Sequence, residues 1–237
     1  MSENWRLVRR RFASEMQGKP GYWLLSPVTL SLWKGFVELL PRWARGRVLD
    51  VGCGTQPYRP ILEKLGASYY AIDKWVEEPM PDAKLDIQAL DSIPDGSFDT
   101  VFCSQVLEYV AEPHKALGEC FRVLRPGGTL VLSAPFVLGI HDAPHDLFRF
   151  SPFGLRALAE RAGFAVAETR GCGGLLSLLG HYLSVPLVMT FWPVPGFKQV
   201  IWFANKVMVR LIVAIDGALG TERLFPVTSV IVAQRPR

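Results

Sequence analysis

The sequence predicts an α/β fold with a doubly wound, mainly parallel sheet. Between residues 46 and 172, short apolar runs alternate with amphipathic segments of helical periodicity. Strands separated by helical stretches imply right-handed crossovers and parallel pairing. The turn residues agree with this pattern. Arg125-Pro126-Gly127-Gly128 ends a helix and turns into a strand, and Ser151-Pro152 supplies an N-cap before a proline at the first helical position.

The expected elements follow in chain order. The predicted strands lie at residues 47–51, 69–72, 100–103, 129–133, 164–169 and 225–233. The predicted helices between them lie at residues 58–65, 115–124 and 152–162. We predict that residues 1–45 form a basic, aromatic helical extension with a helix near 27–40. We predict that residues 173–220 form an apolar helical insertion. We therefore expect one domain over residues 46–237, preceded by the extension and interrupted by the insertion.

The composition narrows the class of protein. Apolar residues make up 49% of the 237 residues and charged residues 20%, so the chain can form a core. Its four cysteines form no CxxC pair, which disfavours a disulfide framework and fits a reducing, cytoplasmic compartment. The opening residues lack the apolar core of a secretory signal. The net charge of +4 is too weak to indicate nucleic acid, although residues 1–47 hold nine Lys and Arg against three Glu.

A carboxylate and two glycines follow the first predicted strand, in Val48-Leu49-Asp50-Val51-Gly52-Cys53-Gly54-Thr55. Glycines let a ligand approach the backbone, and the amides of the following helix face an anionic group. Asp73 ends the next strand, where a carboxylate can accept hydrogen bonds from both hydroxyls of a ribose. A dinucleotide site needs a third glycine for its pyrophosphate, but this window ends in Pro57 and Asp50 would repel that group. The alternatives are a nucleoside ligand with positive charge and a turn without a ligand.

The ordered series of motifs resembles the class I S-adenosylmethionine-dependent methyltransferases, in particular the group whose first motif reads LDVGCGT. The further segments that carry the resemblance are Leu85-Asp86-Ile87, Ile93-Pro94-Asp95-Gly96-Ser97-Phe98-Asp99, Val101-Phe102-Cys103-Ser104-Gln105-Val106-Leu107-Glu108 and Arg122-Val123-Leu124-Arg125-Pro126-Gly127-Gly128. It covers about residues 46–172 and 225–236. The resemblance implies a seven-stranded Rossmann-like sheet with an antiparallel last strand. It also implies S-adenosylmethionine as cofactor, S-adenosylhomocysteine as product, and no metal.

The resemblance also implies a set of cofactor-binding residues. They are Asp50, Gly52, Cys53, Gly54, Asp73, Lys74, Asp86, Ile87 and Ser104. Asp50 would face the methionine ammonium, and Asp73 would hold the ribose hydroxyls. Asp86 would accept from the adenine amino group while Ile87 packs on the ring, and Ser104 would lie near the methionine end.

The sequence departs from this group at two positions. Gln56 replaces the usual third glycine, and Tyr109 stands where the group has histidine. Any role of that histidine is therefore not expected here. Glu108, next to Tyr109, is interpreted as a structural residue rather than a general base.

Two histidines, His141 and His145, follow the strand predicted at 129–133, where open α/β sheets place substrates. With an ordinary pKa of about 6.5, either could act as a general base on a hydroxyl, and we name both as candidate catalytic residues. A metal site is a second interpretation, which the loop prolines and the missing distal ligand disfavour. A third is a structural clamp in which Asp146 pairs with Arg149.

These residues predict methyl transfer to a small or lipid-like acceptor, with O-methylation as the favoured chemistry. Displacement at a sulfonium methyl releases a neutral sulfide, so it depends mainly on in-line positioning, which can contribute ~7–11 kcal/mol. Two other functions stay open: a non-catalytic S-adenosylmethionine-binding protein and an NAD(P)-linked oxidoreductase. Nucleic acid is disfavoured as substrate, because no Asn-Pro-Pro-Tyr-like motif follows the fourth strand, where Ser104-Gln105-Val106-Leu107 stands.

The apolar insertion leaves three interpretations open. Leu175–Trp192 has no formal charge, but it is shorter than the ~20 residues that span a bilayer and it contains Pro186. Lys198, Lys206 and Arg210 follow among aromatic residues, as in helices that lie on anionic lipid. Residues 173–220 could therefore cap a pocket, form a homodimer surface, or contact a membrane. We expect a cytoplasmic protein, with association at the inner face of the membrane as the alternative.

Overall fold

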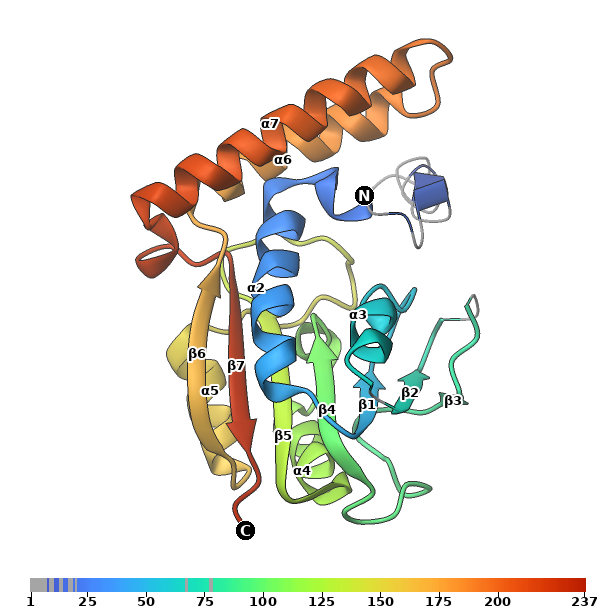
Figure 1. Cartoon of the computed structure of the whole chain (residues 1–237), viewed down its shortest axis with the longest axis vertical. Coiled ribbons are helices and arrows are strands. Elements are labelled where there is room, and N and C mark those ends of the chain that lie inside the picture. The colour runs from blue at the N-terminus through green and yellow to red at the C-terminus, as the bar shows by residue number, and fades with distance from the viewer. Residues whose placement is uncertain are drawn as a thin grey trace. The chain divides into compact units, whose positions relative to one another are not determined.

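The computed structural model describes residues 8, 11–12, 15–16, 19, 21–66, 68–76 and 79–237 (Figure 1). The chain divides into two compact units, which are described one at a time. The sheet unit comprises residues 36–136, 145–170 and 229–237, and the helical unit comprises residues 1–35, 137–144 and 171–228. Most of the predicted extension before residue 21 lies outside the described residues.

The sheet has seven strands. They are β1 (Arg47–Val51), β2 (Ser68–Asp73), β3 (Ala83–Lys84), β4 (Phe98–Ser104), β5 (Leu124–Pro135), β6 (Ala165–Cys172) and β7 (Thr228–Gln234). Their order is β3-β2-β1-β4-β5-β7-β6, and β1 pairs in parallel with both β2 and β4. Figure 1 shows β7 running opposite to β4 and β6. The predicted doubly wound, mostly parallel sheet with a reversed last strand is confirmed.

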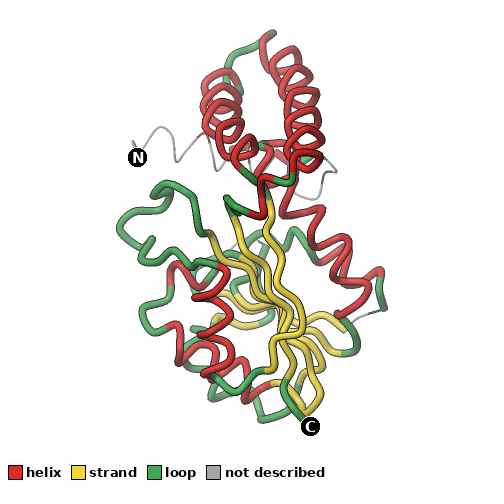
Figure 2. Tube along the Cα trace, turned by 90° about the vertical axis from the view of Figure 1, so that its left-hand side faces the viewer, coloured by secondary structure: helices red, strands yellow, loops and turns green. Residues whose placement is uncertain are grey.

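The strand order reverses between β1 and β4, which defines the switch point where α/β folds bind ligands. The helices of this unit are α3 (Arg59–Lys64), α4 (Pro113–Val123) and α5 (Pro152–Arg161), with a 3₁₀ turn η2 (Leu107–Tyr109). Figure 2 shows helices on both faces of the sheet. α4 buries Ala116, Leu117, Cys120 and Val123, and this spacing places one face of the helix against the core.

Two predicted boundaries have different outcomes. The Ser151 hydroxyl accepts a 3.1 Å hydrogen bond from the amide of Gly154, so it caps α5 as predicted. The segment predicted as a turn at 125–128 lies within β5, but its pairing with β4 is irregular there and Gly127 has a positive φ of +76°. Gly127 and Gly128 exchange backbone hydrogen bonds with Arg235 after β7, at 2.8 and 2.9 Å.

The helical unit contains the predicted insertion as two helices, α6 (Leu175–Phe191) and α7 (Phe197–Leu219). The short helix η1 (Tyr22–Leu25), the start of α2 (Pro27–Trp43) and η3 (Thr221–Arg223) belong to the same unit. α6 and α7 pack closely, since a Cβ on Gly180 would lie 2.7 Å from Ile212. Asn205 donates to the Leu24 carbonyl at 2.8 Å, which ties α7 to η1.

Candidate cofactor site

The glycine loop after β1 lies at the switch point. The amides of Gly52 and Cys53 both donate to the Ile72 carbonyl, at 2.8 and 3.1 Å, so the loop leans on the end of β2. Gly52 and Gly54 both have positive φ, +66° and +52°. A Cβ on Gly52 would lie 2.4 Å from Val106, whereas one on Gly54 would meet nothing within 4 Å. Gly52 is therefore required for packing, and Gly54 exposes backbone to open space where a ligand fits.

Asp73 ends β2 and is only 7% exposed. Its Oδ2 accepts from the Gly54 amide at 3.0 Å, and its Oδ1 accepts from the amides of Trp75 and Val76 at 2.8 and 3.0 Å. A carboxylate has about four acceptor positions, so these three bonds leave room for about one more donor. The structure therefore places Asp73 against the glycine loop, oriented by its own backbone neighbours.

Asp50 lies in β1, two residues before Gly52, and is only 2% exposed. Tyr69, from β2, donates its hydroxyl to Asp50 Oδ2. Burial raises the pKa of Asp50 to about 7, and the nearby charge of Asp73 raises it further. The hydrogen bond from Tyr69 favours the charged form and opposes this rise. A cationic ligand beside Asp50 would favour its ionised form. Burial together with these two acids also raises the pKa of the Cys53 thiol to about 12, so the thiol is neutral at ordinary pH.

Lys74 and Asp86 meet in an ion pair. Their Nζ and Oδ2 atoms are 2.8 Å apart, and Asp86 Oδ1 accepts from the Gln88 amide at 2.9 Å. Burial acts to raise the pKa of Asp86, but the hydrogen bonds from Lys74 and Gln88 outweigh it and lower the pKa. Ile87 is 6% exposed and packs in the main core. An adenine amino group at Asp86 would therefore share that carboxylate with Lys74.

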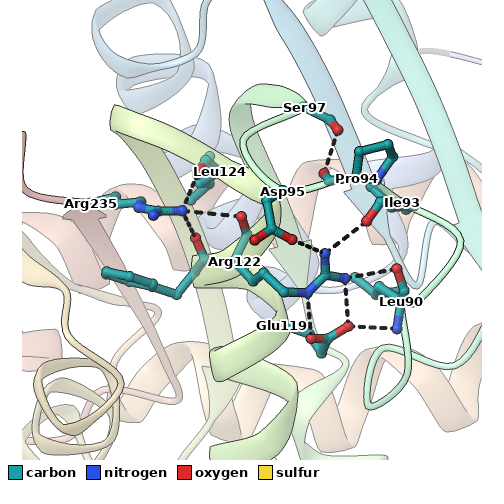
Figure 3. A network of polar contacts seen from close by, with 10 residues as sticks. Leu90, Ile93, Pro94, Asp95, Ser97, Glu119, Arg122, Leu124 and Arg235 are labelled. Atoms are coloured by element: carbon teal, nitrogen blue, oxygen red, sulfur yellow. Dashed lines mark hydrogen bonds and ion pairs between the residues drawn. The ribbon is translucent and has the colours of Figure 1, made fainter.

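A network centred on Arg122 of α4 holds the loop that carries Asp86 (Figure 3). Its guanidinium donates to the carbonyls of Leu90 and Ile93, both at 2.8 Å. Glu119 accepts from Arg122 at 2.8 and 2.9 Å and from the Leu90 amide at 2.7 Å. The arginine motif that marked the resemblance is thus a support for the acidic loop.

Ser104 ends β4. Ser133 contacts both Ser104 and Gln105, and the sequence did not indicate these contacts. The hydroxyls of Ser104 and Ser133 are 3.1 Å apart. The side-chain amide of Gln105 donates to the Ser133 hydroxyl at 3.0 Å. Gln105 has a φ of +57°, which is unfavourable for a residue with a side chain. Gln56 has a φ of +53°, in the left-handed region that favours glycine. Backbone strain of this kind concentrates at functional sites.

The two candidate histidines fall in different units. His145 belongs to the sheet unit, with its ring centroid 6.1 Å from that of Trp75, two residues beyond Asp73. His141 belongs to the helical unit, and its Nδ1 lies 3.2 Å from the carbonyl of Gly139. Trp75 is 60% exposed, and no signal in the sequence pointed to its pairing with His145.

The rest of the histidine loop is anchored within the sheet unit. Arg149 donates to Asp146 Oδ2 at 2.6 Å, so the pairing expected of a loop clamp is present. The Glu108 carbonyl accepts from the amides of Leu147 and Phe148 at 2.7 and 3.2 Å. The Glu108 carboxyl is fully buried with no hydrogen-bond partner among the described residues, and burial raises its pKa to about 8. Within those residues, no group of three or more His, Cys, Asp or Glu could hold a metal ion.

Together, the parallel sheet, its switch point and the acids at the ends of β1 and β2 define an α/β domain suited to a nucleoside ligand. Residues 49–132 match a family model described as a methyltransferase domain. Over these residues the match supports the family that the motifs indicated, the class I S-adenosylmethionine-dependent methyltransferases.

Two curated relatives carry the same name, ubiquinone biosynthesis O-methyltransferase. The chain is 33% identical to the protein of Xanthomonas oryzae pv. oryzae over 140 residues, which cover 51% of this chain and 57% of that one. It is 29% identical to the protein of Psychrobacter cryohalolentis over 206 residues, which cover 73% of this chain and 72% of that one. The chain thus spans little more than half the length of the first relative.

Solved structures agree on the fold. An S-adenosylmethionine-dependent methyltransferase from Archaeoglobus fulgidus matches with a TM-score of 0.57 at 18% identity, covering 95% of this chain and 99% of that one. The [4+2]-cyclase SpnF matches with a TM-score of 0.61 at 19% identity, covering 88% and 82%. Likeness at this identity concerns the fold alone, and the second of these proteins is named for a reaction other than methyl transfer. The reaction of this chain must therefore be argued from its residues.

Proposed function

We propose that the protein transfers a methyl group from S-adenosylmethionine to a hydroxyl of a small, lipid-like acceptor. The observation that carries the proposal is the open space beside Gly54, whose amide donates to the buried acid Asp73, with a second buried acid, Asp50, on β1 before the same loop. Two acids repel a pyrophosphate but suit a ligand with a ribose and a positive charge. The name of the curated relatives supports a hydroxyl as the acceptor group.

Each part of the loop would have one task in holding the cofactor. Asp73 would accept from the ribose, and its three backbone donors would keep the carboxylate in place. Asp50 would face the methionine ammonium, and Gly52, Cys53 and Gly54 would pass beneath the cofactor. S-adenosylmethionine supplies an activated methyl group when bound, so the protein must mainly orient the acceptor and exclude water.

The adenine end would use a different set of residues. Asp86, with Lys74 beside it, would accept from the amino group, and Ile87 would border the ring. Ser104 would lie at the methionine end. Its contact with Ser133 limits the rotation of both hydroxyls.

A hydroxyl acceptor loses its proton during the reaction, and a histidine is suited to take it. We assign this role first to His145, because it stands beside Trp75 in the unit that contains the glycine loop. His141 is the alternative base. If both His145→Ala and His141→Ala keep the turnover and the cofactor affinity of the wild type, the loop is a clamp and no histidine acts as base.

The proposal is tested by calorimetry followed by a transfer assay. S-adenosylhomocysteine should bind the purified protein, and labelled S-adenosylmethionine should transfer its methyl group to a hydroxyl compound in a panel with and without apolar tails. Binding without transfer to any member would instead support a non-catalytic cofactor-binding protein. Binding of NADH without S-adenosylhomocysteine would support an oxidoreductase. We expect a cytoplasmic enzyme, with association at the inner face of the membrane as the alternative.

A further inference from the structure

The outer face of α7 is apolar along its length. Its exposed apolar residues recur every three or four positions and share one side of the helix. They are Val200, Phe203, Val207, Leu211, Ile215 and Leu219. Phe203 is 65% exposed and Leu211 58%, although large apolar side chains usually find a partner. The opposite side of α7 is buried through Asn205, Val209 and Val213. We call the exposed side, with the matching side of α6, the hairpin face.

α6 extends this face. Leu175, Leu179 and Leu183 are four residues apart and are exposed, and α6 contains no charged residue. Both helices bury their other sides on the same segment, because Ser184 and Asn205 both donate to the carbonyl of Leu25. The exposed apolar sides of α6 and α7 therefore both lie away from that segment.

Charge on the hairpin face has one sign. Lys206 and Arg210 stand one helical turn apart beside the apolar row, next to Phe203 and Leu211. The Nζ of Lys206 lies 5.9 Å from the centroid of the Phe203 ring. Asp216 is the only acid in α6 and α7, and it is 2% exposed. The face thus offers apolar area with positive charge at its edge and no exposed carboxylate of α6 or α7.

The carboxylate of Asp216 is occupied by hydrogen bonds within the helical unit. It accepts from the amides of Gly174 and Ser177 at 2.8 and 2.9 Å, and from the hydroxyls of Ser177 and Thr221. These hydrogen bonds outweigh its burial and lower its pKa, so the charge is retained within the start of α6. It therefore cannot balance Lys206 or Arg210 on the outer face.

We propose that the hairpin face docks on the surface of a bilayer that contains anionic lipid, with α6 and α7 lying in the plane of the interface. Apolar side chains would enter the acyl boundary while Lys206 and Arg210 reach the headgroups. A symmetric contact between two copies fits less well, because neither copy offers an exposed carboxylate on α6 or α7 to pair with Lys206 and Arg210. Among the described residues, no helix is both long and apolar enough to cross a bilayer. This inference does not depend on the methyl-transfer reaction.

Flotation of the full chain with vesicles tests the proposal. The wild type should bind vesicles of phosphatidylcholine with phosphatidylglycerol more tightly than vesicles of phosphatidylcholine alone. High salt should weaken its binding to the anionic vesicles. Lys206→Gln with Arg210→Gln should weaken binding roughly fivefold for each charge removed. Phe203→Ser with Leu211→Ser should weaken it about tenfold or more for each side chain.

Matched controls come from the sheet unit. Phe153→Ser removes an apolar side chain that is 83% exposed on α5, and Lys64→Gln with Arg161→Gln removes two exposed cations. Both controls should bind the anionic vesicles as the wild type does. All variants should have the melting temperature of the wild type. No binding of the wild type to anionic vesicles, or equal loss in the controls, would overturn the proposal. A doubled mass in light scattering that only the hairpin variants abolish would also overturn it and identify a dimer surface.

Discussion

The carboxylate of Asp73 accepts a 3.0 Å hydrogen bond from the amide of Gly54, which joins the end of β2 to the glycine loop after β1. The two residues therefore act as one structural unit, in which the acid fixes the loop and the loop orients the acid. A ligand in the open space beside Gly54 would therefore lie close to Asp73. This arrangement links the cofactor affinity to the shape of the loop.

Replacing Asp73 separates its contribution to cofactor affinity from its contribution to the stability of the glycine loop. Asp73→Ala should weaken the binding of S-adenosylhomocysteine by about 1.5–3 kcal/mol for each ribose hydrogen bond that is lost. It should also lower the melting temperature, because the amides of Gly54, Trp75 and Val76 lose their acceptor. Calorimetric titration and thermal unfolding measure the two effects. Asp91→Ala, at an exposed acid of the neighbouring loop, is the control. A folded Asp73→Ala protein with unchanged affinity would refute the ribose assignment.

The affinity for S-adenosylmethionine should depend on the charge of Asp50. Because the pKa of Asp50 is about 7, the carboxyl is mostly protonated below that pH and mostly ionised above it. A cationic ligand binds better to the ionised form, so the affinity should rise as the pH increases through about 7. Asp50→Asn should bind more weakly above pH 7 and lack this rise. An identical pH profile for the wild type and Asp50→Asn would show that Asp50 does not face the ammonium.

Glu108 should make the protein less stable as the pH rises. Its pKa is about 8 in the folded protein and near the ordinary value of 4.5 in the unfolded chain. Between these values the folded protein binds more protons than the unfolded chain, so the free energy of unfolding falls with increasing pH. The stability that the neutral carboxyl permits is complete below about pH 4.5 and is lost as the pH rises through about 8.

Glu108→Gln isolates this effect, since the amide has similar shape and no charge. The difference in unfolding free energy between variant and wild type should grow in favour of the variant from pH 5 to pH 8, by no more than about 4 kcal/mol. Urea unfolding at several pH values measures it. Asp50 titrates in both proteins and cancels in the difference. A constant difference over this range would show that Glu108 does not hold its proton in the folded state.

The sequence predicted the strands and the glycine loop because those signals are local. Asp50, Gly52 and Gly54 lie within five residues of one another, and the conformation of each depends on its own neighbours. The two-residue strand β3 was missed, because Ala83–Lys84 is too short to show a period. The pairing of Tyr69 with Asp50 was also missed, since it depends on the register of β1 against β2.

Side-chain partners far apart in sequence were the hardest to predict. Lys74 and Asp86 were both expected near the cofactor, but nothing in their spacing indicated that they would pair with each other. His141 and His145 are four residues apart, yet the chain passes from one compact unit to the other between them. Such outcomes depend on tertiary packing, which one sequence pattern does not contain.

Gln56 offers a test of the strained backbone in the loop. At a φ of +53°, a residue with a Cβ is disfavoured by about 1–2 kcal/mol relative to glycine. Gln56→Ala and Gln56→Gly both lose the side-chain contacts with Arg59 and Met80, so their difference reports the backbone alone. Gln56→Gly should therefore be more stable than Gln56→Ala, by about 1 kcal/mol in urea unfolding.

The reverse order is expected where the backbone is helical. Gln199 lies in α7 and is exposed, so Gln199→Ala should be more stable than Gln199→Gly by about 1 kcal/mol. The same order at both positions would contradict the positive φ of Gln56. If the order does reverse, the strain at Gln56 is real, and the glutamine persists because its amide and its carbonyl oxygen hold Met80 and Arg59 beside the cofactor loop. In that case Gln56→Gly should bind S-adenosylhomocysteine more weakly than the wild type although its backbone is relaxed, since the loop would no longer be held in place.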